Sequence, residues 1–343
     1  MIRYPKHFYP GATIAVTAPS GGVRENWRVK FDRTLQDLRD NGYKVIEGQC
    51  LYSHIKNVSA PAQERASELM SFLCDATIDA IFPPCGGDLA IELLPLLDFD
   101  KLALMPPKWV LGFSDISTLL LPLTIISGWA TAHGDHLYER SSDNTEPLTI
   151  GIEQVLQTKI GASVKQKSST RYRSVDFFSQ PPKAPVWAET RWKSLGENVD
   201  EEVFMKGRLI GGCLDRIARL AGTKYGNIQK FVDANVNDGV ILHLENAGMR
   251  PDELARTLTA LRLHGWFDSI SGLMIGRSSG PDMRHPDSLF YLDVLRNNLS
   301  GMDCPVIFDV DIGHQRPQLT LIQGALAQVR SRNGSGHVLQ TFD

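Results

Sequence analysis

The stretch KWVLGFSDISTLLLPL (Lys108–Leu123) decides the fold, because a strand-like apolar run passes directly into a helix-like one. Its first part is typical of a buried strand, and Gly112 permits a tight turn after that strand. Apolar residues then continue for the length of a helix. A strand that leads at once into a helix is the unit from which parallel sheets are built. The stretch therefore predicts an α/β fold.

The first half of the chain repeats this alternation of strand-like and helix-like segments. One helix-like run, at 27–43, closes with Asn41 and Gly42, which are typical of a helix end. Strands joined through helices form right-handed crossovers, and these produce a parallel sheet covered on both faces. The strand-like segments lie at 13–20, 44–48, 79–87, 108–113 and 129–134.

The chain has 343 residues, which is more than one hydrophobic core usually supports, so we expect two domains. From about residue 148 to 202 it is polar, rich in Ser and Lys and interrupted by prolines, which indicates a linker and a long loop. After this segment a mixed α/β pattern begins. We predict a first α/β domain at 1–165, a linker with an aromatic-bearing loop at 166–202, and a mixed α/β domain at 203–343.

Composition and charge exclude several classes of protein. The net charge of −3 provides no global basic field for a nucleic acid polymer or an anionic membrane. No apolar run reaches the roughly 20 residues that span a bilayer. The N-terminus lacks the apolar core of a signal peptide, so we expect a cytoplasmic protein. The five cysteines lack metal-site spacing, and no dinucleotide fingerprint or P-loop occurs, so we expect no metal and no cofactor.

Ser114 is the first candidate for chemistry. A serine is a nucleophile only when a base takes its proton and donors stabilise the oxyanion. At a strand-to-helix turn the side chain stands free, and the N–H groups that open the helix point toward developing negative charge. The elbow motif of the α/β-hydrolases is not matched, because Ile116 replaces its second glycine. The alternative is that Ser114 or Asp115 only caps the helix.

Five further positions carry groups that suit a serine hydrolase. Gly86 and Gly87 end a strand, where their N–H groups either line an oxyanion hole or simply form a tight turn. Glu245 follows the strand-like run VILHLE and either orients a histidine or is a solvated charge at the strand end. His314, in DVDIGHQRP, is either a base on a loop or a surface histidine. His133, in TAHGD, is the rival base.

Seven motifs follow one another along the chain: IAVTAPSGG, IFPPCGG, VLGFSDIS, RLIGGCLDRIARLAGT, LHLENAGMRPDELARTLTALRLHGWF, GLMIGR and DIGHQRPQLTLIQGA. In order and spacing this set resembles the LD-carboxypeptidase family of serine peptidases, which includes the microcin C self-immunity proteins. The resemblance covers roughly residues 10–330. Each motif alone is weak, whereas seven in register are specific.

The resemblance implies a catalytic triad of Ser114, Glu245 and His314. Ser114 then attacks an amide carbonyl, and His314 takes the serine proton and later gives it to the leaving amine. Glu245 holds the tautomer of the imidazole and stabilises its charged form. The implied oxyanion donors are the backbone N–H groups of Asp115 and of one glycine in Gly86–Gly87, and no metal is required.

The resemblance also implies the architecture. The first domain is then flavodoxin-like and carries Ser114, and the second has a small barrel-like sheet and carries Glu245 and His314. The active site lies in the cleft between the two domains, where ligands commonly bind. Members of the family are typically homodimers, so we expect a homodimer.

The middle segment bears on the substrate. Its length resembles the self-immunity branch, which implies peptidyl- or aminoacyl-nucleotide substrates. The alternative is the branch that releases terminal D-alanine from murein tetrapeptides. Trp192 is a candidate to stack on a nucleotide base, and the alternative for it is a hydrophobic anchor of the loop. A ligand-binding protein of the same fold without catalytic activity is the remaining reading.

Overall fold

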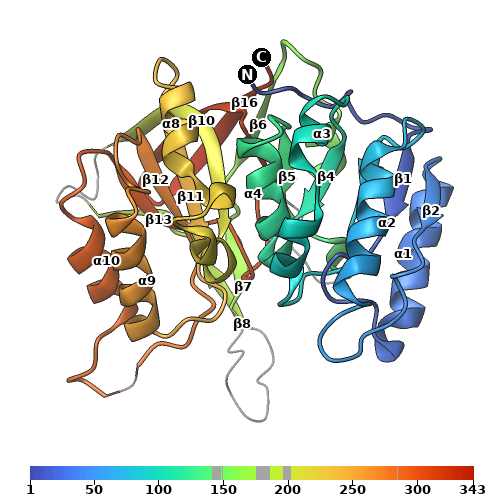
Figure 1. Cartoon of the computed structure of the whole chain (residues 1–343). Coiled ribbons are helices and arrows are strands. Elements are labelled where there is room, and N and C mark those ends of the chain that lie inside the picture. Colours follow the sequence, from blue (N-terminus) through green and yellow to red (C-terminus); the bar gives the residue numbers. More distant parts are fainter. Residues whose placement is uncertain (141–147, 149, 175–185, 196–201, 284) are drawn as a thin grey trace.

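Two large sheets, one built mainly from each half of the chain, form the framework of the described part of the molecule (Figure 1). The computed structural model describes residues 1–140, 148, 150–174, 186–195, 202–283 and 285–343. The predicted α/β class is confirmed, because the first half forms a parallel sheet and the second half a mixed one. The parts of the predicted middle loop at 175–185 and 196–201 lie outside the described residues.

The first sheet has six strands in the order β14-β5-β4-β3-β1-β2. The five strands from the first half are parallel, as their helical connections predict. β14 (Leu321–Gln323) comes from the far end of the chain and pairs with β5 in antiparallel orientation. The parallel strands are β1 (Thr13–Val16), β2 (Lys44–Glu47), β3 (Ala80–Ile81), β4 (Trp109–Gly112) and β5 (Thr131–His133).

The second sheet has eight strands in the order β6-β16-β15-β10-β11-β12-β13-β9. Its central strands, β10 to β13, are parallel, and antiparallel strands flank them. The resemblance implied a barrel-like sheet, and the structure corrects this expectation. In the described part of the chain the sheet is open, with β6 and β9 at its two edges. The strands are β6 (Ser163–Lys167), β9 (Lys193–Ser194), β10 (Val203–Cys213), β11 (Val240–Glu245), β12 (Gly272–Gly276), β13 (Val306–Val310), β15 (Leu326–Arg332) and β16 (Ser335–Thr341).

Helices connect these strands, and a separate hairpin pairs β7 (Arg171–Ser174) with β8 (Val186–Glu189). Among the described residues, no helix combines the length and the apolar character that crossing a bilayer requires. The α-helices are α1 (Arg28–Asp40), α2 (Ala62–Cys74), α3 (Phe99–Ala103), α4 (Ser117–Ile125), α5 (Leu137–Arg140), α6 (Ile152–Leu156), α7 (Leu214–Ile217), α8 (Ile228–Ala234), α9 (Pro251–Leu263) and α10 (Tyr291–Leu299). The 3-10 helices are η1 (Glu25–Trp27), η2 (Ala90–Leu96), η3 (Ser114–Ile116), η4 (Ala218–Leu220) and η5 (Lys224–Gly226).

The two halves exchange strands at their border. β6 belongs to the first half in sequence but pairs with β16 in the second sheet, and β14 makes the reverse exchange. The chain therefore crosses between the halves more than once. The domain bounds given above, with a linker at 166–202, stay a prediction.

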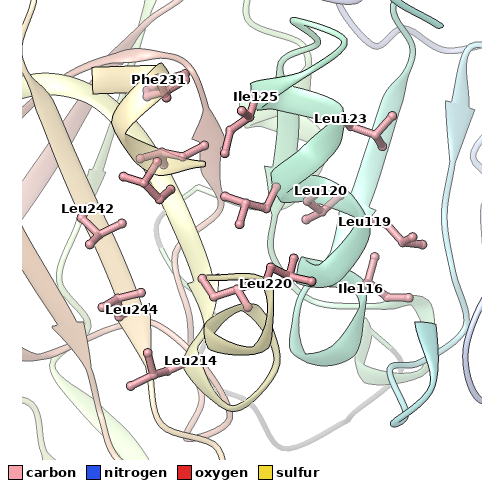
Figure 2. Packing of buried hydrophobic residues seen from close by; sticks show 14 of the residues in the cluster. Ile116, Leu119, Leu120, Leu123, Ile125, Leu214, Leu220, Phe231, Leu242 and Leu244 are labelled. Atoms are coloured by element: carbon pink, nitrogen blue, oxygen red, sulfur yellow. The ribbon is translucent and has the colours of Figure 1, made fainter. Parts of the chain in front are cut away.

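α4 lies at the centre of the molecule, and all nine of its residues are buried. A helix that is apolar on every side must be covered on every side. One side of α4 packs against the first sheet, and Figure 2 shows its other side facing side chains of the second half. A single hydrophobic cluster thus runs through both halves. The members labelled there are Ile116, Leu119, Leu120, Leu123, Ile125, Leu214, Leu220, Phe231, Leu242 and Leu244.

Because this cluster is shared, we expect a cavity in it to destabilise the whole chain. Leu120 is fully buried, so Leu120→Ala should lower the free energy of unfolding by about 2–5 kcal/mol. Leu104 is 88% exposed, and Leu104→Ala is the matched control with little expected change. Urea unfolding followed by circular dichroism measures both variants. Equal stability of the two variants would contradict the shared core.

Candidate active site

Ser114 lies where the first sheet meets α4. β4 ends at Gly112, and the backbone of Ser114 has a positive φ of 53°. Residues with a side chain rarely adopt this left-handed conformation, which costs about 1–3 kcal/mol and persists only where the surroundings impose it. The turn holds the Ser114 side chain at partial exposure, between a strand and a helix that are both buried. This is the geometry that presents a side chain for reaction.

Gly86 lies directly against Ser114. A β-carbon built on Gly86 would stand 2.9 Å from the Ser114 Cβ and 3.1 Å from its Oγ, so a larger residue does not fit there. The carbonyl of Gly86 accepts a hydrogen bond from the Gly21 N–H at 3.0 Å, which fixes this approach. Gly87, the next residue, lies in the same way against Ser20. Three strand-end loops therefore converge at the serine.

The side chain of Asp115 ties these loops together. It is buried and accepts hydrogen bonds from the Ser20 hydroxyl at 2.5 Å and from the Ala90 N–H at 2.8 Å. The sequence indicates Asp115 only as a backbone donor or a helix cap, and its connecting role becomes visible in the folded chain. In the sequence, this contact between loops is indicated only by the serine and glycine residues in three loops that follow neighbouring strands.

Glu245 and His314 form a buried pair. Glu245 is the last residue of β11 and is fully buried, which rules out the reading as a solvated charge. Its Oε2 lies 3.0 Å from the Nδ1 of His314, and since a carboxylate can only accept, Nδ1 carries the proton of this hydrogen bond. The imidazole packs against Phe113, with ring centroids 4.8 Å apart. His314 therefore lies beside the residue that precedes Ser114.

The pair shifts the pKa values of both groups. Burial alone would lower the pKa of His314, but the charge and hydrogen bond of Glu245, with a smaller effect of Asp215, outweigh it and raise this pKa above 6.5. Burial alone would raise the pKa of Glu245, but His314 outweighs it and lowers this pKa. Glu245 is thus ionised at neutral pH, and the pKa of His314 lies above the ordinary value of a histidine. Such a histidine is suited to move a proton.

His133 and His243 lie behind this pair rather than in it. Both are fully buried, and their rings meet at 5.1 Å between centroids. Burial is the main cause that lowers the pKa of each to about 3, so both stay neutral. Burial also raises the pKa of the Cys85 thiol to about 12, which rules out a thiolate at neutral pH. His133, the rival base, therefore does not titrate near neutral pH, and the Cys85 thiol is not a second nucleophile.

Trp192 is a buried anchor, and the prediction that it stacks on a nucleotide base is corrected. Its indole is only 2% exposed and packs on Gly336 in the core of the second sheet. The Nε1–H donates to the Asp311 carboxylate at 2.8 Å. This environment fits the alternative that the sequence left open, in which Trp192 is a hydrophobic anchor of the loop.

A second set of contacts was not apparent from the sequence. Asp215, on α7, accepts hydrogen bonds from the N–H groups of Ala247 and Gly248 at 2.8 and 2.9 Å, and so holds the loop that follows Glu245. Asp215 lies in the quoted motif RLIGGCLDRIARLAGT, but its partners are more than thirty residues away in sequence. Only the folded chain reveals this contact.

Two known protein domains match this chain. The LD-carboxypeptidase N-terminal domain matches residues 14–134, and the LD-carboxypeptidase C-terminal domain matches residues 206–329. The chain belongs to the LD-carboxypeptidase family. The family resemblance noted from the seven motifs is thereby confirmed.

The similar proteins include a self-immunity protein and a muramoyltetrapeptide carboxypeptidase. The microcin self-immunity protein MccF of Escherichia coli is 26% identical over 320 residues, which cover 92% of this chain and 89% of that protein. A solved structure of MccF in complex with aspartyl sulfamoyl adenosine shares the fold with a TM-score of 0.79 and 22% identity over 100% of this chain and 99% of that one. A solved structure of a muramoyltetrapeptide carboxypeptidase from Oxalobacter formigenes also shares the fold. Its TM-score is 0.72, with 22% identity over 96% of this chain and 99% of that one.

The raised pKa of His314 can be measured without a substrate. We expect an NMR titration to give a pKa above 6.5 for His314 in the wild type. Glu245→Gln should lower it, because burial and the charge of Arg216 are then opposed only by the smaller effect of Asp215. Asp233→Asn, at an exposed position of α8, removes the same charge elsewhere and is the control. A pKa that Glu245→Gln leaves unchanged would contradict the pairing.

Proposed function

We propose that this member of the family is a serine peptidase that hydrolyses an amide bond of a small peptide-like substrate. The observation that carries the proposal is the strained turn at Ser114 beside the buried pair of Glu245 and His314. These three residue types in this arrangement supply a nucleophile, a base and a group that orients the base. The homodimer and the cytoplasmic location stay predictions.

In the proposed mechanism, Ser114 attacks the carbonyl carbon of the amide, and its proton passes to the Nε2 of His314. The Glu245 carboxylate keeps the proton on Nδ1 and stabilises the imidazolium that forms. Collapse of the tetrahedral intermediate breaks the C–N bond, and His314 donates its proton to the leaving amine. Water then hydrolyses the acyl-enzyme by the same steps in which His314 is again the base.

The oxyanion that forms during attack requires donors. We assign this role to the backbone N–H of Asp115 and to a backbone N–H of the Gly86–Gly87 turn, which touches Ser114. Backbone donors held rigidly cost no reorganisation when charge develops, so each contributes substantially to the rate. The carboxylate of Asp115, with its bonds to Ser20 and Ala90, supplies that rigidity.

Ser114→Ala tests whether the protein is a serine peptidase or a catalytically inactive ligand-binding protein of the same fold. We expect turnover to fall at least about a thousandfold, because no other group replaces the nucleophile. Ser300→Ala, at the exposed end of α10, is the matched control and should retain wild-type turnover. Circular dichroism and thermal unfolding establish that both variants fold. Near-normal hydrolysis by Ser114→Ala would reject the proposed function.

A peptidyl- or aminoacyl-nucleotide is the second candidate substrate, and Trp187 favours it. Trp187 lies on β8, is 40% exposed and carries the Arg171 guanidinium over its ring at 4.4 Å. It pairs in register with Arg173, whose N–H donates to the carbonyl of Arg316, two residues after His314. The hairpin thus presents an accessible aromatic ring close to the loop of the proposed base, which suits stacking on a nucleotide base.

The two substrates can be separated with Trp187→Ala. For an aminoacyl-adenylate substrate we expect kcat/KM to fall by about 5- to 100-fold, the worth of one stacking contact, with little change for an L,D-linked tetrapeptide. Val186→Ala, next to it on β8 and also exposed, is the control. Equal losses on both substrates would remove the stacking role of Trp187. Such a result would leave the amidase assignment untouched.

A further inference from the structure

His136 holds the residue that precedes Ser114. Its ring is buried and packs on the ring of Phe113, with centroids 4.5 Å apart. The backbone N–H of Phe113 lies 3.3 Å from the Nε2 of His136. The Phe113 ring also contacts the imidazole of His314. His136 therefore fixes a residue that adjoins both the proposed nucleophile and the proposed base.

Glu139 sets the tautomer of His136. Its Oε2 lies 3.1 Å from the His136 Nδ1, and since a carboxylate only accepts, Nδ1 carries the proton. Burial is the largest cause that lowers the pKa of His136 to about 3, so the ring is neutral at neutral pH and Nε2 keeps a lone pair. That lone pair accepts the hydrogen bond from the Phe113 N–H. The contact on the side of the nucleophile thus depends on Glu139.

The other oxygen of Glu139 faces the loop of the base. Its Oε1 lies 3.3 Å from the Nη2 of Arg316, two residues after His314, and the Arg316 Nη1 donates to the backbone carbonyl of Glu139 at 3.3 Å. The Arg316 Nε lies 3.4 Å from the Asp135 Oδ1. The side chains of Glu139 and Arg316 are 18% and 16% exposed, so salt screens this pair less than a pair on the open surface.

The helix that carries Glu139, α5, is fixed against the third part of the proposed site. The N–H groups of its first two residues donate to the carbonyls of Pro83 and Pro84 at 3.3 and 3.0 Å. These prolines lead into the Gly86–Gly87 turn, which is assigned one of the oxyanion donors. α5 is therefore a fixed support from which Glu139 contacts the nucleophile side and the base side at once.

We propose that Glu139 is a positioning residue that holds Ser114 and His314 in register. One of its oxygens acts on the turn of the nucleophile through His136, and the other acts on the loop of the base through Arg316. The inference rests on the proposed function and goes beyond it, because it names a group outside the triad that aligns the two halves of the site. A shift of about 1 Å between reacting groups costs about a hundredfold in rate, so such a link acts on kcat.

Glu139→Gln tests this link. The amide replaces one of the two carboxylate oxygens by an NH2 group, which cannot accept from His136 or from Arg316. With whichever of the two substrates described above the wild type turns over faster, we expect kcat to fall by about 10- to 100-fold and KM to stay within about threefold. Glu139→Asp keeps both acceptors on a shorter side chain and should retain more of kcat.

Two NMR measurements separate positioning from an effect of charge, and neither requires turnover. Hydrogen exchange of the Phe113 amide should be about tenfold faster in Glu139→Gln, because His136 is no longer oriented to accept its hydrogen bond. The pKa of His314 should stay close to its wild-type value, because Glu245, the largest of the causes that raise it, is retained.

Arg316 provides the second arm of the test. Arg316→Gln should also lower kcat, and Arg316→Lys, which keeps the charge, should retain more of it. Because the two groups act as one link, the double variant with Glu139→Gln should lose clearly less than the product of the two single losses. Glu64→Gln and Arg33→Gln remove the same charges at exposed positions of α2 and α1 and should keep the wild-type kcat. Thermal unfolding checks that all variants are folded.

Several outcomes would overturn the inference. Unchanged kcat in Glu139→Gln, or a rise in KM alone, would show that Glu139 does not align the reacting groups. A pKa of His314 that falls together with kcat would mean that Glu139 acts by its charge. Unchanged exchange of the Phe113 amide would remove the link even without turnover. The proposed function fails separately: an inactive Ser114→Ala beside a normal Glu139→Gln rejects only the positioning role.

Discussion

The packing of α4 between the two halves is the constraint on which the site depends. This helix is buried on all sides, so its first turn cannot move without opening the core that both halves share. Ser114 opens the 3-10 helix η3 that leads into α4, whereas Glu245 ends β11 and His314 lies on the loop after β13. Groups separated by more than a hundred residues in sequence thereby acquire fixed relative positions. Hydrophobic packing supplies the preorganisation that a catalytic arrangement requires.

Close backbone approach is the second constraint, and it explains why glycines recur at the ends of strands here. Gly86 meets Ser114 at a distance that excludes a β-carbon, and Gly212 meets Ser117 in the same way. Each glycine lets one loop lie against the turn that carries the serine. Asp115 then fixes the loops by hydrogen bonds from side chain and backbone. The strain at Ser114 is balanced by these surrounding contacts.

The parts of the fold that depend on neighbouring residues could be predicted from the sequence. The passage of β4 into α4 is evident from hydrophobic pattern and from Gly112, and the motif order pointed to the family that the domain matches confirm. Trp192 shows the limit, because its burial depends on Asp311 and Gly336, more than a hundred residues away. An aromatic residue in a polar segment looks the same in sequence whether its partner is a ligand or a distant core. The open second sheet likewise depends on strand pairing that no single segment specifies.

The electrostatics of the site combine opposing charges around one histidine. Glu245 and Asp215 raise the pKa of His314, and Arg216 together with burial lowers it. The net effect raises this pKa, and the Glu245 carboxylate is the largest of the causes that act in that direction. A carboxylate in this position stabilises the charged form of the imidazole, which is the form that arises when a histidine takes a proton.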